Sequence, residues 1–374
     1  MKININTFLL LMISVYAQAE TIEYNTNIRV GAQYHDSTDT QAGNDLALGG
    51  YLHAQTKSVS GISLGATLHT SNALFNQNDA FGVPFFMTES KSYAILSEAY
   101  IKGEFDKTTF ILGRQLIDTP FLDSDDIGMV PNTFEAYTIM NQDIKDISLL
   151  YSYVRNMSGV DADIPEEFSD INAGAGAHIV GINYEAVENI ALSGWFYHIP
   201  DFAKLTYLDA GYENSVESFN YALGVQVALQ DFVVGESAKI FGLSASAEHQ
   251  ESALTLSLAY NKSFDEVAIN GFGGGPFFAN DEHMTLADVG KDGSMLIYGV
   301  DWDASEVLTK GLSIGIKQAQ LKDGQNHEGD ETDILLSCIA SDRLTFDAVY
   351  STLDNSKISG DEFDNLRVFV NYSF

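Results

Sequence analysis

Apolar and polar residues alternate along most of this chain, in runs of about ten residues. The last run shows the pattern best, since its apolar positions are Leu366, Val368, Val370, Tyr372 and Phe374. A period of two places successive side chains on opposite faces of a β-strand. The pattern therefore predicts strands that have one apolar face and one mostly polar face.

Eighteen such runs can be counted, and the connections between them alternate in length. The runs begin near residues 26, 45, 60, 93, 107, 134, 146, 177, 189, 203, 218, 239, 252, 294, 311, 332, 343 and 364. Long gaps follow odd-numbered runs, at residues 70–92, 117–133, 155–176, 262–293, 321–331 and 353–363. Short turns at one end and long loops at the other are typical of outer-membrane barrels.

A soluble β-sandwich is the competing fold, because its strands also alternate. Sandwich strands usually have about five or six residues, whereas a tilted membrane strand needs about 9–11. The runs here have the membrane length, and Tyr and Phe often lie at their ends, where an aromatic girdle is expected. We therefore predict an all-β fold, an 18-stranded antiparallel transmembrane β-barrel.

Composition narrows the classes of function. The 374 residues carry a formal net charge of −33, which argues against binding to nucleic-acid phosphates. A single cysteine excludes a disulfide framework, and the eight histidines show no metal-ligand spacing. No metal, cofactor or nucleic-acid partner is therefore predicted.

The first residues have the features of an export signal. Lys2 precedes an apolar stretch at residues 8–16, and Ala17 and Ala19 form a small-x-small cleavage site. We expect a signal peptide at residues 1–19 and a barrel domain at residues 20–374. Export and the strand pattern together predict a location in the cell outer membrane.

The most specific local motif is LGRQLIDTPFLDSDDIGMVPNTFEAY, residues 112–137. This segment resembles the OprD-type outer-membrane porins, in the branch common among epsilon-class proteobacteria. The residues that carry the resemblance are Gly113-Arg114-Gln115, Asp118-Thr119-Pro120, Asp125-Asp126, Met129 and Pro131-Asn132-Thr133-Phe134-Glu135.

The resemblance implies an 18-stranded porin whose third extracellular loop folds into the lumen and narrows it. By position, residues 117–133 form that loop. The family also has a ladder of basic residues on the opposite wall. One position departs from the pattern, because Gly128 stands where related sequences often carry arginine.

The candidate constriction residues fall into an acidic and a basic set. If Ile28 and Val368 face lipid, the alternation points their polar neighbours into the lumen. The wall set is Arg29, Lys317 and Arg367, and the loop set is Asp118, Asp123, Asp125, Asp126 and Glu135, with Arg114 as an ion-pair partner. The alternatives are solvated loop charges, a motif that only docks the loop, and lumenal basic residues placed by chance.

Two Gly-x-Ser-x-Gly matches, at residues 61–65 and 311–315, raise the question of hydrolysis. A nucleophile elbow needs a strand, a sharp turn and a helix, whereas both matches begin alternating strands. Residues 271–276 are glycine-rich but open no helix, so they do not indicate a dinucleotide site. We therefore predict that the chain is not an enzyme.

The sequence thus predicts a porin for small hydrophilic solutes and ions, with a mild preference for cations. The alternatives are an outer-membrane barrel enzyme and a surface or structural barrel with a closed lumen. Expected partners are outer-membrane lipids and lipopolysaccharide, with divalent cations bridging acidic loops as a further alternative. The barrel assembly machinery is expected to recognise Phe374, and both a monomer and a homotrimer remain open.

Overall fold

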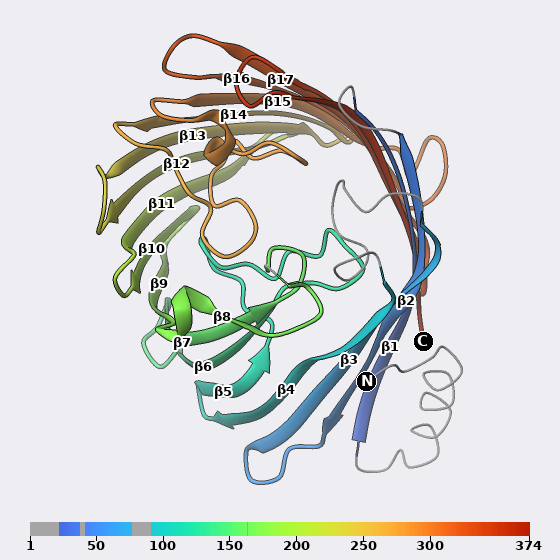
Figure 1. The fold of residues 1–374 in the computed structure, drawn as a ribbon, viewed down its shortest axis with the longest axis vertical. Coiled ribbons are helices and arrows are strands. Elements are labelled where there is room, and N and C mark those ends of the chain that lie inside the picture. Colours follow the sequence, from blue (N-terminus) through green and yellow to red (C-terminus); the bar gives the residue numbers. More distant parts are fainter. Residues whose placement is uncertain (1–21, 38–41, 77–90, 163) are drawn as a thin grey trace.

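The strands of this chain form one closed, antiparallel barrel (Figure 1). The computed structural model describes residues 22–37, 42–76, 91–162 and 164–374. The first strand pairs with the second and also with the last, which closes the sheet on itself. The predicted signal peptide, residues 1–19, lies outside the described residues and stays a prediction.

Eighteen long strands make the wall, as predicted, and a nineteenth strand, β8, is only two residues long and pairs with β7. The strands are β1 (Ile22–Ser37), β2 (Gly43–Thr56), β3 (Ile62–Asn76), β4 (Tyr93–Phe105), β5 (Thr108–Gln115), β6 (Thr133–Asn141), β7 (Ile147–Ser158), β8 (Ser169–Asp170), β9 (Ala177–Val187), β10 (Ile190–Ile199), β11 (Ala203–Val216), β12 (Phe219–Phe232), β13 (Ala238–His249), β14 (Leu254–Phe264), β15 (Ser294–Asp303), β16 (Leu312–Lys322), β17 (Glu328–Ser341), β18 (Leu344–Asn355) and β19 (Asp361–Ser373).

Helices have little part in the described structure. Its two helical segments are short 3-10 turns, Ile171–Gly174 and Leu286–Val289. Within the described ranges, no helix has the length and apolar character needed to cross a membrane.

The predicted strand starts agree with the observed starts to within four residues. Three of the predicted long loops are wrong in length. The strand β3 continues to Asn76, so the first predicted loop, residues 70–92, begins seven residues too early. The strands β16 to β19 extend further than their alternation suggested, so the connections are only residues 323–327 and 356–360, in place of 321–331 and 353–363.

The outward face of the wall is apolar. On β12, Leu223, Val225, Val227 and Leu229 point outward with 36–51% of their surface exposed, whereas Gln226 and Gln230 point inward and are buried. No described part of the chain covers this apolar face. The strand alternation therefore separates a lipid-facing surface from a polar lumen.

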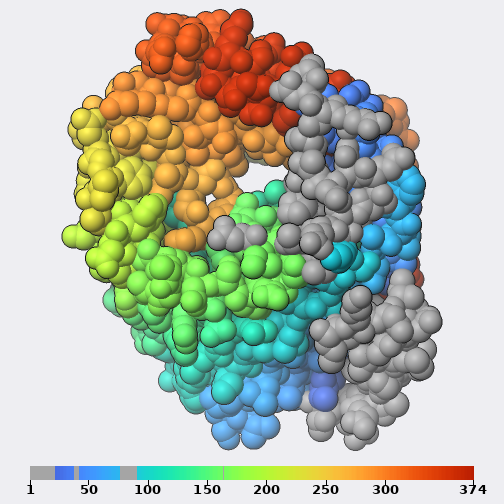
Figure 2. Space-filling model, in the orientation of Figure 1, coloured from blue at the N-terminus to red at the C-terminus, as the bar shows by residue number. Residues whose placement is uncertain are grey.

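Among the described loops, two long ones fold into the lumen: residues 116–132 between β5 and β6, and residues 265–293 between β14 and β15 (Figure 1). Their side chains Phe121, Leu122, Leu286 and Val289 are fully buried, so the largest hydrophobic core lies inside the barrel between these loops and the wall. Figure 2 shows an opening near the centre of the barrel that the loops leave free.

Candidate pore constriction

The β5–β6 loop crosses the lumen from one wall to the other. At one end, the ring of Phe121 packs edge-on against Tyr197 of β10 and Tyr207 of β11, with ring centroids 5.3 and 5.9 Å apart. At the other end, Asp126 binds Arg29 of β1. The predicted inward-folded loop therefore spans the barrel and divides its cross-section.

The side chains of the sequence motif hold this loop in shape. The carboxylate of Asp118 accepts hydrogen bonds from the backbone N–H (3.1 Å) and the hydroxyl of Ser124. The amide of Asn132 donates to Asp161 of the β7–β9 loop at 2.6 Å, and the backbone N–H of Asp161 donates back at 3.1 Å. Asp118 thus has a loop-shaping role.

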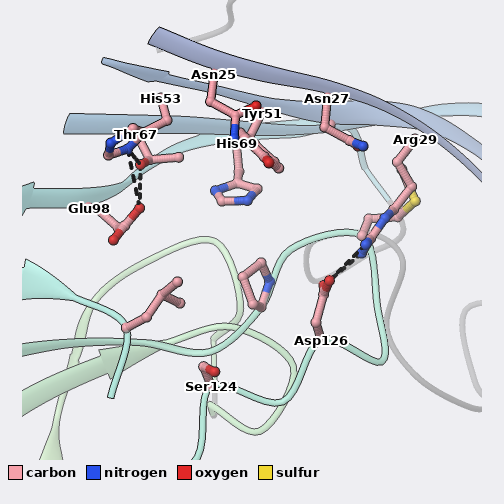
Figure 3. A pocket seen from close by; sticks show the side chains of 14 residues that line it. Asn25, Asn27, Arg29, Tyr51, His53, Thr67, His69, Glu98, Ser124 and Asp126 are labelled. Atoms are coloured by element: carbon pink, nitrogen blue, oxygen red, sulfur yellow. Dashed lines mark hydrogen bonds and ion pairs between the residues drawn. The ribbon is translucent and has the colours of Figure 1, made fainter. Parts of the chain in front are cut away.

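Arg29 is the main anchor of the loop tip (Figure 3). Its two terminal nitrogens donate to the two carboxylate oxygens of Asp126 at 2.6 and 2.7 Å, and Nη1 also donates to the carbonyl of Gly128 at 2.7 Å. Nε donates to Asn371 at 2.8 Å, and the guanidinium lies 5.0 Å from the ring centroid of Phe369. Four of its five donors are therefore engaged. A wall arginine thus contacts the loop at the carbonyl of Gly128.

The β14–β15 loop is the second part of the constriction, and sequence analysis missed it. Its Glu282 accepts a hydrogen bond of 2.7 Å from Arg367 of β19, and its Asp281 lies 3.8 Å from the ammonium of Lys317 on β16. The three predicted wall cations thus all face the lumen, and a loop carboxylate lies beside each of them. Only one of those carboxylates, Asp126, belongs to the predicted set.

Glycines let the two loops approach closely. Residues 271–274 contact the β5–β6 loop, and Phe272 donates its backbone N–H to the carbonyl of Phe121 at 2.9 Å. Gly271 has φ +85°, and a Cβ there would lie 2.3 Å from that carbonyl oxygen. The glycine-rich motif therefore joins the two loops into one plug.

A cavity of about 280 Å³ lies between the plug and the wall formed by β18, β19 and β1. We call this cavity the eyelet; Ile127, Val349, Phe369 and Asn371 are among its lining residues. Its charged lining residues are Arg29 and Arg367 against Asp126, Glu282 and Asp347. The acids therefore exceed the bases by one.

The other predicted acids lie away from the eyelet lining. The carboxylate of Asp123 accepts the backbone N–H of Asp125 at 2.8 Å. Burial, followed by the charges of Asp161 and Asp123, raises the pKa of Asp125 to about 7. Asp125 thus carries only part of a charge at neutral pH.

Arg114 and Glu135 lie at the root of the β5–β6 loop. Nη1 of Arg114 donates to the carbonyl of Leu96 at 3.0 Å, and its guanidinium lies 4.2 Å from the ring centroid of Phe168. Its Nε is 3.9 Å from the carboxylate of Glu135, a long ion pair. The structure brings these two residues together, but at the loop root and outside the eyelet lining.

A second cavity of about 280 Å³ adjoins Arg29 and Asp126 on the side of β2–β4 (Figure 3). Nδ1 of His53 is 2.7 Å from the hydroxyl of Thr67, which donates to Glu98. Sequence reasoning missed this group because its members are far apart in the chain. Strand pairing brings them together. The one signal in the sequence was that each of them lies on the polar, lumen-facing side of its strand.

Comparison with known proteins gives the class of protein that the sequence motif predicts, the outer-membrane porins. Residues 87–374 match the family model for outer membrane porin, OprD family. No curated protein sequence matches the chain significantly. The fold is similar to a BenF-like porin from Pseudomonas fluorescens Pf-5, with TM-score 0.82 and 14% identity over 95% of this chain and 99% of that one.

Two further solved structures show the same likeness. Pseudomonas aeruginosa OpdK with vanillate has TM-score 0.80 and 15% identity, over 94% of this chain and 98% of that one. Acinetobacter baumannii OccAB3 has TM-score 0.79 and 15% identity, over 94% and 99%. With the family match over most of its length, the closed 18-stranded wall and the inward loops, this chain belongs to the OprD family of outer membrane porins.

Proposed function

We propose that this porin passes small hydrophilic solutes and ions with a mild preference for cations. The observation that carries the proposal is the charge of the eyelet, where three carboxylates face two arginines. Arg29 has four of its five donors engaged by the loop and the wall, which leaves little of its hydrogen-bonding capacity for a passing anion. Charged rings at a narrow point set the ion preference of a pore.

Bilayer recording tests this proposal. The full chain, inserted into a planar lipid bilayer, is expected to show an open-channel conductance. In a potassium chloride gradient, its reversal potential is expected to have the sign of cation preference. An anion-selective potential would contradict the proposed selectivity, and a barrel with no conductance would favour a closed structural role.

The positions of the two serine motifs support the view that the chain is not an enzyme. Ser63 lies on β3 with 2% of its surface exposed, and Ser313 lies on β16 opposite Ser337 of β17. Neither serine stands at a strand-to-helix turn, the geometry that a nucleophile elbow needs.

The motif at residues 112–137 supports placing the chain in the epsilonproteobacterial branch of the family. Asp118 and Asn132, two residues that carry the resemblance, both stabilise the inward loop. The apolar outward face supports contact with outer-membrane lipids and lipopolysaccharide, either as a monomer or as a homotrimer.

Deleting Phe374 is expected to lower the yield of folded barrel. Its backbone N–H donates to the carbonyl of Thr26 at 3.1 Å, and its ring packs on Tyr372 with centroids 5.0 Å apart. The ring is 63% exposed, so an assembly partner can reach it. The heat-modifiable folded band on a gel measures the effect, and Phe374→Tyr is the matched control. Normal assembly of the deletion variant would remove Phe374 from the assembly signal.

A further inference from the structure

The β14–β15 loop is held on the wall through its backbone. Glu331 of β17 accepts hydrogen bonds from the backbone N–H groups of His283 and Met284, both at 2.9 Å. Gln226 of β12 accepts from the backbone N–H of Phe278 at 2.6 Å. The loop therefore has a defined seat between two parts of the wall.

Two carboxyl groups meet at this seat without a donor between them. Asp281 of the loop has a fully buried side chain, and Asp333 of β17 is also fully buried. Lys317 of β16 is paired with Asp333 in the strand register and its ammonium lies 3.8 Å from Asp281, so both carboxyl groups lie beside the same cation. No group of the described chain donates a hydrogen bond to any of their four oxygens. Ionised carboxylate oxygens only accept hydrogen bonds, so one proton shared between Asp281 and Asp333 would supply the missing donor.

The charges around the pair do not neutralise it. The ammonium of Lys317 lies 3.8 Å from Asp281 and can balance one carboxylate, while Glu331 adds a further buried acid. Two carboxylates in contact do not both ionise readily, so such a pair retains one proton.

The remaining ionisable neighbours supply no second counter-charge. Arg367 is already bound to Glu282. Burial and the charge of Arg367 lower the pKa of His283 to about 4, so this ring is neutral near pH 7. His35 of β1 lies on the far side of Phe363, whose ring centroid is 4.8 Å from that of His35 and 5.0 Å from that of His283.

We propose that Asp281 and Asp333 form a proton-dependent latch, in which one shared proton keeps the β14–β15 loop seated and its loss releases the loop from the wall. The released loop takes Glu282 away from the eyelet and widens the passage. The pore therefore opens further as the surroundings become alkaline.

The direction follows from the difference between the two states. In the seated loop, burial first and then Asp333 and Glu331 raise the pKa of Asp281 to about 9, and Lys317 opposes them. A released, solvated aspartate has a pKa of about 3.9. The seated state binds the extra proton, so seating is strongest below about pH 4 and weakens as the pH rises toward about 9. One linked proton changes the released-to-seated ratio by up to about tenfold per pH unit.

Single-channel recording of the full chain between about pH 5 and about pH 10 tests the latch. The wild type is expected to gain open time and conductance as the pH rises. Asp333→Asn gives Asp281 an amide donor in place of the proton, so the loop stays seated and this pH dependence is lost. Asp231→Asn, an exposed carboxylate on β12 that accepts a hydrogen bond from Ser237, is the control and retains it.

Infrared spectroscopy gives a second reading that needs no conductance. The wild type is expected to show protonated carboxylic-acid absorption at pH 7 that disappears at alkaline pH. Asp125 and Glu331 contribute to this absorption because burial raises the pKa of each, so Asp333→Asn and Asp281→Asn should each lose only the component of the shared proton. If that component is absent, or if calcium chloride rather than acid quiets the channel, the shared proton is overturned in favour of a bound cation. Retained pH dependence in both variants would also overturn the latch.

Discussion

Replacing Asp126 by asparagine is expected to shift the reversal potential toward anion preference, whereas Asp125→Asn leaves it nearly unchanged at neutral pH. The carboxylate of Asp126 lines the eyelet, and 52% of its side chain is exposed. Its removal leaves Arg29 and Arg367 against two acids. Since charges act over about 8 Å at physiological salt, one charge matters in so narrow a passage.

Asp125 is the matched control because it is the adjacent carboxyl in the same loop. It does not line the eyelet, and its pKa of about 7 leaves it partly protonated at neutral pH. Arg29→Gln should shift the potential in the opposite direction and also loosen the loop tip, which shows as channel noise. Equal shifts from the two aspartate variants would mean that the loop tip does not face the ion path.

The barrel wall could be predicted from the sequence because strand alternation is a local signal. A period of two fixes which side chains face the lumen, so Arg29, Lys317 and Arg367 were assigned inward correctly. The loops at residues 323–327 and 356–360 were overestimated because acidic residues there interrupt the apolar pattern while the strands continue. Charged strand ends beyond the membrane still pair as a sheet.

The plug inside the barrel could be predicted only in part. The β5–β6 loop has a motif whose residues stabilise it, and that motif located the loop. The β14–β15 loop has a glycine-rich motif that contacts the other loop, but no motif marks its seat on the wall. That seat consists of backbone hydrogen bonds to Gln226, Asn261 and Glu331 on three different strands. The sequence shows only that these residues are polar and face the lumen, and does not show which groups they bind. Their partners emerge only when the barrel closes.

The same alternation makes a strong prediction about stability on β13. Leu243 lies near the middle of that strand, points outward with 47% of its surface exposed, and pairs with the outward Val225 of β12. Ser246 of the same strand points inward, where it lines a cavity that also contains Glu213 and Glu248. A side chain introduced at position 243 therefore lies in lipid, whereas the same side chain at position 246 lies in the hydrated, acidic lumen.

Leu243→Arg is expected to lower the free energy of unfolding by about 2–4 kcal/mol, because it places a cation near the bilayer midplane. Ser246→Arg is expected to cost much less, since water and two carboxylates surround the new guanidinium. Urea unfolding of the barrel in lipid vesicles, followed by tryptophan fluorescence, measures both values. Equal losses at the two positions would mean that the assignment of lipid-facing and lumen-facing side chains on β13 is wrong. Because the pairing from β13 through β14 and β15 to β16 has no register shift, the inward assignment of Lys317 would then fail as well.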